Sequence, residues 1–130
     1  ERLNLYKELN QIKDNDNLIS FEQKLIDRFG KLPNKIAILF NAIKLRWVGK
    51  KLGFEKIVLK NNSLRAFFTT DKNSNYFESV NFKKIMNYLR ENPKDCQVKE
   101  NRGKLSLRKE GVMEINQALE LFNKLINQKT

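Results

Sequence analysis

The chain has 130 residues, of which 40% are hydrophobic and two are proline, so its length and composition favour one folded domain and argue against disorder. It contains no histidine, the commonest general base and metal ligand, and its one cysteine cannot form an internal disulfide. We therefore expect no metal, no cofactor and no catalysis. The formal net charge of +11 favours negatively charged partners. The sequence has no long apolar run, which argues against a membrane span.

The first predicted helix covers residues 2–13. One helical stripe of apolar side chains supports it: Leu5, Leu9 and Ile12. Residues 14–17 are all Asp or Asn, and this run predicts a loop.

The second predicted helix begins after Ser20, a candidate N-cap, and ends at Phe29. Its expected inward stripe consists of Phe21, Leu25 and Phe29. Its polar face carries Lys24, Asp27 and Arg28. Gly30 suits the end of this helix and Pro33 the first turn of the next one, so a corner between two helices is expected.

The third predicted helix spans residues 34–52, with Gly53 beyond its end. It has two apolar stripes, the first formed by Ile36, Leu39, Phe40, Ile43 and Trp47, and the second by Ile38, Ala42, Leu45 and Leu52. Two stripes indicate packing on two sides, so this helix is the expected spine of the domain. We interpret Phe40 and Trp47 as core residues; an aromatic recognition surface is the alternative.

The remainder predicts strands at 57–59 and 64–68, a helix at 82–89, and a second strand pair at 96–99 and 105–108. A final helix carries the stripe Val112, Ile115, Leu119, Phe122 and Ile126. The predicted fold class is α+β: three N-terminal helices, then two ββα-like units that form a small, mostly antiparallel sheet covered by helices.

The positive charge is concentrated in residues 31–60, which contain 8 basic residues and 1 acidic residue. The candidate nucleic-acid contacts are Lys44, Arg46, Lys50 and Lys51 on the third helix. The alternative is that these side chains simply solvate the surface.

Cys96 is the one candidate nucleophile. No base that could activate its thiol is evident, so we interpret it as a small apolar residue near a strand.

Four segments carry a family resemblance. They are residues 2–7 (RLNLYK), 24–33 (KLIDRFGKLP), 42–45 (AIKL) and 51–57 (KLGFEKI). Together they resemble the C-terminal domain of the bacterial transcription-repair coupling factors.

The resemblance implies that residues 1–130 form a single regulatory domain of a larger cytoplasmic, ATP-driven DNA translocase. Such a translocase displaces stalled RNA polymerase and recruits the excision-repair protein UvrA. The domain itself is implied to be non-catalytic. It docks on the UvrB-like N-terminal module of the same chain, masks the UvrA-binding surface and restrains the motor. A basic accessory module that binds DNA is the alternative.

The resemblance also implies an interdomain contact on the polar face of the second helix, at Lys24 and Asp27. Asp27 keeps the acidic residue of the family, whereas Lys24 stands where a glutamate is usual, and Glu22 is a candidate substitute. Arg28 is expected either to join the contact or to bind the carbonyls at the helix end.

Overall fold

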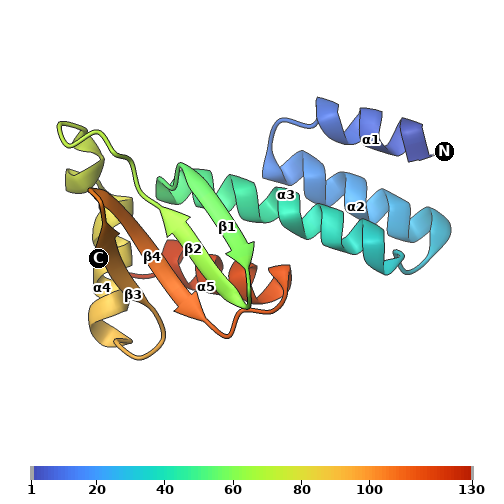
Figure 1. Ribbon diagram of the computed structural model, residues 1–130. Coiled ribbons are helices and arrows are strands. Elements are labelled where there is room, and N and C mark those ends of the chain that lie inside the picture. The colour runs from blue at the N-terminus through green and yellow to red at the C-terminus, as the bar shows by residue number, and fades with distance from the viewer. Residues whose placement is uncertain (1, 130) are drawn as a thin grey trace. The chain divides into compact units, whose positions relative to one another are not determined.

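The computed structural model describes residues 2–129 and confirms the α+β fold class (Figure 1). The chain divides into two compact units, one up to Lys44 and one from Leu45 onward. Helix α3 (Asn34–Leu52) contributes its first residues to unit 1 and its last turns to unit 2. Among the described residues, no helix has the length and apolar content that crossing a bilayer requires.

Unit 1 is helical and consists of α1 (Arg2–Gln11), α2 (Asn15–Phe29) and the first part of α3. Phe40 of α3 is fully buried, which confirms its prediction as a core residue, and its ring lies 6.0 Å from that of Phe21 on α2. Leu18 on α2 and Leu9 on α1 are buried as well. Unit 1 therefore buries a small set of apolar side chains.

The predicted loop at residues 14–17 and the N-cap at Ser20 are wrong, because α2 begins at Asn15. Asp14 is the N-cap, and its carboxylate accepts a hydrogen bond from the Asn17 N–H at 2.8 Å. The first turn of a helix has N–H groups without helical partners, so a nearby carboxylate makes a polar run compatible with helix. Ser20 lies exposed inside the helix.

Phe29 was predicted to point inward, but 63% of it is exposed. It is the last residue of α2, and Gly30 follows with a φ of 83°, so the apolar stripe continues past the part of the helix that is packed. The second predicted stripe of α3 is wrong at Ile38, which lies in the second turn of the helix and is 54% exposed. Leu45 and Leu52 of that stripe are buried, and Trp47 is half-buried.

Unit 2 contains a four-stranded sheet that is antiparallel throughout. Its strands are β1 (Lys56–Lys60), β2 (Ser63–Phe67), β3 (Gln97–Asn101) and β4 (Lys104–Glu110), in the order β1-β2-β4-β3. The first hairpin turns at Asn61 and Asn62, which have φ values of 54° and 59°. Asparagine tolerates this left-handed conformation, which two-residue hairpins require. The predicted pair of hairpins is confirmed.

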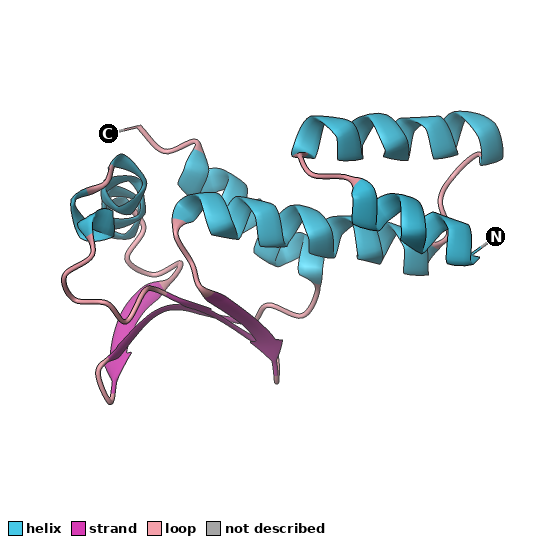
Figure 2. Ribbon diagram, turned by 90° about the horizontal axis from the view of Figure 1, so that it is seen from above, coloured by secondary structure: helices cyan, strands magenta, loops and turns pink. Residues whose placement is uncertain are grey.

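Helices lie on one side of the sheet only (Figure 2). They are the end of α3, the short 3-10 helix η1 (Asn75–Glu78), α4 (Val80–Glu91) and α5 (Ile115–Ile126). Their apolar faces pack with the inner face of the sheet in one core, which includes Leu64, Ile85, Leu107 and Phe122. The sheet therefore has one covered face and one face that no helix of this unit covers.

Val112 was predicted to lie on the last helix, but it precedes α5. It is nevertheless buried in the core. Gly111 has a φ of 78° and turns the chain, and Glu114 caps the helix, so the helix begins only at Ile115. Cys96 is buried directly before β3, which confirms its interpretation as a small apolar residue.

Candidate interaction surfaces

Helix α2 carries the four residues predicted to contact another domain. Lys24, Asp27 and Arg28 are exposed, and Glu22 is half-buried. The Asp27 carboxylate accepts a hydrogen bond from the Gln23 side chain at 2.9 Å. Helical spacing places Gln23 and Asp27 one turn apart, so this bond also fixes the direction of the carboxylate.

Arg28 lies in the last turn of α2, and its guanidinium carbon is 5.1 Å from the centroid of the Phe29 ring. This distance is typical of a cation–π contact. The contact places a positive charge beside an exposed aromatic ring at the end of the helix.

Glu22 and Lys44 form an ion pair with each other at 2.8 Å, although they were predicted to belong to two different surfaces. The pair joins α2 to α3 inside unit 1, and both side chains are 21% exposed. A carboxylate held this way is a poor substitute for the acid that the family usually has at the position of Lys24. The same pair removes Lys44 from the freely available cations of α3.

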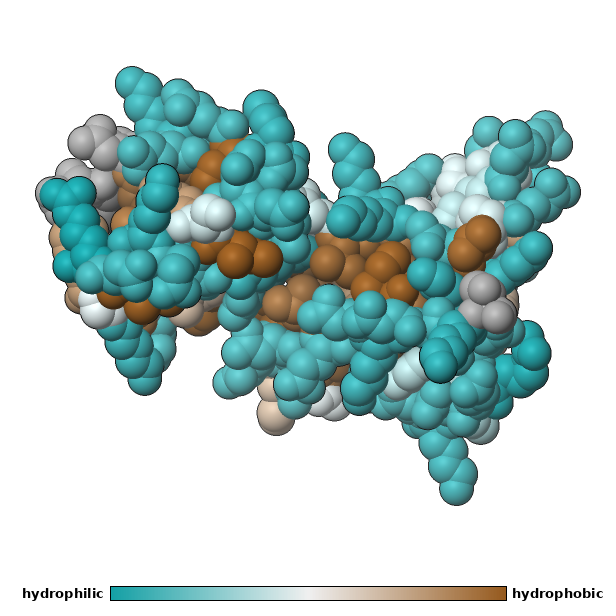
Figure 3. Space-filling model, turned by 180° about the vertical axis from the view of Figure 1, so that it is seen from behind, coloured by the Kyte–Doolittle hydropathy of each residue, from teal (hydrophilic) through white to brown (hydrophobic). Residues whose placement is uncertain are grey.

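Two exposed isoleucines on α2 were missed by the sequence analysis. Ile19 is 48% exposed and Ile26 is 37% exposed. They are seven residues apart, about two helical turns, so they lie on the same side of the helix, about 100° around the axis from Asp27. The signal was available: α2 contains more apolar residues than one inward stripe can use. Figure 3 shows apolar side chains reaching the molecular surface between polar ones.

The remaining cations predicted to contact nucleic acid are exposed on the second half of α3. Arg46 and Lys50 are four residues apart and share one side of the helix, whereas Lys51 points to a neighbouring side. Lys50 and Lys51 occupy the last turn, where cations stabilise a helix through its dipole. The main-chain carbonyl of Lys51 accepts a hydrogen bond from Asn81 at 2.7 Å.

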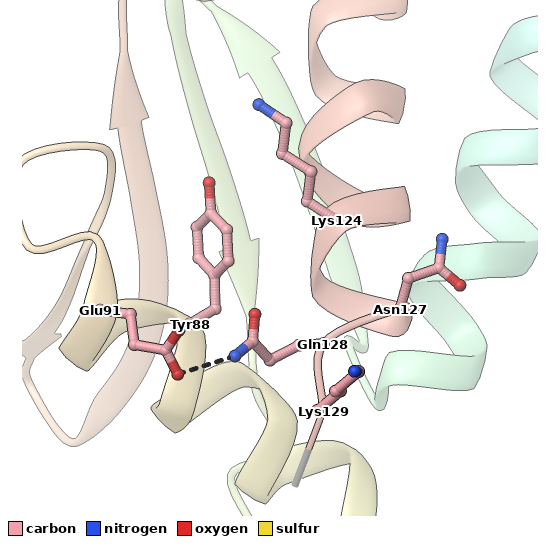
Figure 4. Close-up of a pocket in the computed structure, with 6 residues that line it drawn as sticks. All are labelled: Tyr88, Glu91, Lys124, Asn127, Gln128 and Lys129. Carbon is pink, nitrogen blue, oxygen red and sulfur yellow. Dashed lines mark hydrogen bonds between the residues drawn. The ribbon is translucent and has the colours of Figure 1, made fainter.

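A shallow hollow of about 510 Å³ lies at the ends of α4 and α5 in unit 2 (Figure 4). Its lining residues are Tyr88, Glu91, Lys124, Asn127, Gln128 and Lys129. The Gln128 side chain donates a hydrogen bond to Glu91 at 3.0 Å, and the Lys84 ammonium donates one to the Ile126 carbonyl at 2.9 Å. These bonds attach the last residue of α5 and the segment after it to α4, which is a structural role.

A polar network lies beside the hollow. The Asp95 carboxylate accepts hydrogen bonds from the Lys109 ammonium and the Tyr88 hydroxyl. Burial by itself would raise the pKa of Asp95, but the hydrogen bonds from Lys109 and Tyr88 outweigh it and hold that pKa below its ordinary value. Burial raises the pKa of Tyr88, and the neighbouring carboxylate adds to this effect.

Cys96 is next to this network. Burial, with the Asp95 charge second, raises the pKa of its thiol to about 11. A buried thiol that stays protonated at neutral pH is a weak nucleophile. Among the described residues, no group of three or more Cys, Asp or Glu side chains could hold a metal ion.

Comparison with protein families assigns the chain to a family. The model of the TRCF domain family matches residues 1–79, more than half of the chain. The chain belongs to the TRCF domain family. The match covers all eight predicted contact residues and extends through β1, β2 and η1. No curated protein matches the chain. Membership in this family makes the chain a transcription-repair coupling factor domain, as the resemblance implied.

Proposed function

We propose that the chain is a non-catalytic regulatory domain that docks on the UvrB-like N-terminal module of its own parent protein. The docked domain masks the UvrA-binding surface and restrains the translocase. Engagement of RNA polymerase releases the domain, which shifts the equilibrium toward the active state. Family membership supports this role because it places the chain in a repair coupling factor.

The observation that carries the proposal is the composition of the exposed face of α2. Ile19 and Ile26 present apolar surface, and Asp27 presents a negative charge on the adjoining side of the helix, about 100° around the axis. Protein interfaces combine an apolar centre with a polar rim, and two aligned exposed isoleucines with charged residues around the same helix offer both parts. The face therefore has the composition of a docking site.

The charges of this face point to Asp27 as the acidic contact. Glu22 is bonded to Lys44 in unit 1 and is less available to a partner. Lys24 is exposed on the same helix with the opposite sign, so the module would need both a basic and an acidic group opposite α2.

The decisive test is a titration of this chain against the isolated UvrB-like module. Asp27→Arg reverses the charge at the contact and should weaken binding at least tenfold, because truncated or reversed interface charges cost about 2–5 kcal/mol. Glu120→Arg makes the same charge change at an exposed site on α5 and is the matched control. Equal affinities of the wild type and Asp27→Arg would contradict docking through α2.

The masking role is tested in the full-length parent protein. Asp27→Arg should increase both UvrA binding and ATPase activity, whereas Glu120→Arg should leave both unchanged. If Asp27→Arg weakens module binding but does not change UvrA affinity, the domain docks without masking.

A second candidate function is nucleic-acid binding through α3, favoured by the exposure of Arg46 and Lys50 on one side of that helix. The ion pair of Lys44 with Glu22 leaves this surface with three of its four predicted cations.

A further inference from the structure

The uncovered face of the sheet in unit 2 is the largest cationic surface that the strand register assembles. Side chains alternate between the two faces of a strand, so the register decides which residues share a face. Ala66 and Leu107 are partners on β2 and β4, and both are fully buried under the helices. Their neighbours Arg65 and Arg108 therefore belong to the opposite face, which we call the outer face.

The outer face has an excess of positive charge. Its cations come from all four strands and are Lys56, Lys60, Arg65, Lys99, Lys104 and Arg108. Its carboxylate is Glu110, which accepts a hydrogen bond from the Ser63 hydroxyl at 2.7 Å. Figure 2 shows that the helices lie on the other side of the sheet.

At the centre of the outer face, two positively charged residues are cross-strand neighbours, which does not stabilise the sheet. Arg65 on β2 lies directly opposite Arg108 on β4. Like charges directly opposite each other destabilise a sheet. The salt bridges among the described residues are Lys44–Glu22 and Lys109–Asp95, so neither arginine forms a salt bridge with a described carboxylate. A pair of arginines without a salt bridge leaves two positive charges available to an anionic ligand at the centre of the sheet.

The row beside the arginines adds an aromatic ring. Phe67 on β2 lies opposite Lys56 on β1 and Ser106 on β4, and Ser106 lies opposite Lys99 on β3. The Phe67 ring is half-buried, with the Lys56 ammonium 5.8 Å from its centroid. The buried Ser106 hydroxyl accepts a hydrogen bond from Arg108 at 3.2 Å, which directs that guanidinium along the sheet.

We propose that the outer face binds single-stranded nucleic acid. Arg65 and Arg108 contact its phosphates, and Phe67 stacks on one base. A regular polyanion matches cations spread over four strands, and an aromatic ring can stack only on a base that is not already paired and stacked in a duplex. This site uses residues of the sheet and none of α2 or α3, so it does not depend on the proposed docking.

The test measures the anisotropy of a labelled 15-nucleotide oligothymidylate on titration with the whole chain at 50 and 200 mM salt. Arg65→Ala with Arg108→Ala should weaken binding at least tenfold and reduce the salt slope by about 1.4, since each lost phosphate contact on a single strand contributes about 0.7. Phe67→Leu should weaken binding several-fold by removing base stacking.

The matched control is Arg46→Ala with Lys50→Ala, which removes the same charge from α3. It should change affinity less than twofold. Thermal unfolding followed by circular dichroism should show the sheet double variant to be at least as stable as the wild type, because the like-charge pair is gone.

Three results would overturn the proposal. The first is no binding at 50 mM salt. The second is a loss in the α3 double variant that equals or exceeds the loss in the sheet double variant. The third is tighter binding of a 15-base-pair duplex, or displacement of the oligonucleotide by polyglutamate of the same charge concentration, which would indicate a duplex-binding or a general polyanion surface.

Discussion

The two units of the chain distribute their apolar side chains in opposite ways. Unit 2 gathers its buried residues into one core between sheet and helices, whereas the described side chains buried in unit 1 are Leu9, Leu18 and Phe40. Among the side chains that the structure describes, unit 1 instead carries five of the seven exposed large hydrophobic residues: Tyr6, Ile19, Ile26, Phe29 and Ile38. A short helical segment cannot enclose all its apolar surface, and what it leaves exposed is available to a partner.

The largest expected difference between the units is in the cost of losing a phenylalanine. Phe122 is fully buried on α5, with its ring centroid 5.1 Å from that of Phe54. Phe122→Ala should lower the free energy of unfolding by about 3–5 kcal/mol through lost burial and a cavity. Phe29→Ala in unit 1 should cost about 1 kcal/mol or less, because the ring is mostly exposed and loses mainly its contact with Arg28.

Urea unfolding followed by circular dichroism measures both variants. If both variants lower the free energy of unfolding by the same amount, the two phenylalanines contribute equally to stability and the contrast between the units is wrong.

The second expected difference concerns pH. The pKa of Asp95 in unit 2 is held below its ordinary value of about 3.9, so its contribution to stability is present above about pH 4 and is lost as the pH falls through the folded-state pKa. Asp95→Asn should lower stability at pH 7 by about 1–3 kcal/mol, because the amide keeps one of the two acceptor oxygens used by Lys109 and Tyr88 and has no charge to pair with Lys109. It should also remove part of the loss on acidification.

Urea midpoints at pH 7 and pH 3 test this expectation. Glu100→Gln, at an exposed position on β3, serves as the control and should behave like the wild type. If Asp95→Asn loses as much stability between pH 7 and pH 3 as the wild type does, other carboxylates are responsible for the acid sensitivity.

The smallest expected effect is the coupling between Glu22 and Lys44 in unit 1. A double-mutant cycle with Glu22→Gln and Lys44→Met should give about 0.5–1 kcal/mol, since the pair is single and partly exposed. Glu22→Gln should leave binding to the UvrB-like module within twofold of the wild type. A tenfold loss of that binding would return Glu22 to the docking contact.

Local sequence patterns were sufficient wherever a structure depends on neighbouring residues. Helical spacing located the five α-helices of the described residues, and the two apolar runs on either side of Asn61 and Asn62 located the first hairpin. Errors arose at helix ends. Ser20 and Asp14 are both good capping residues, and the choice between them depends on which N–H groups the folded backbone presents.

The family motif also identified a helix with an exposed polar side, α2. It did not show which charged side chains of that helix are already paired within unit 1. Glu22 and Lys44 are 22 residues apart, and their pairing became visible only when α2 and α3 were packed together. Phe29 followed the correct spacing for burial, yet spacing does not report where the packed part of a helix ends.

The sequence by itself determined the fold class, the basic charge, the lack of histidine chemistry and the TRCF family signature, because these follow from composition and local order. Only the tertiary structure decided which charges are paired inside unit 1 and which are gathered on the outer face of the sheet. Arg65 and Arg108 are distant in sequence, and only the register of β2 against β4 makes them neighbours. Strand register depends on long-range packing of the opposite, buried face, so no local pattern of charged residues could reveal it.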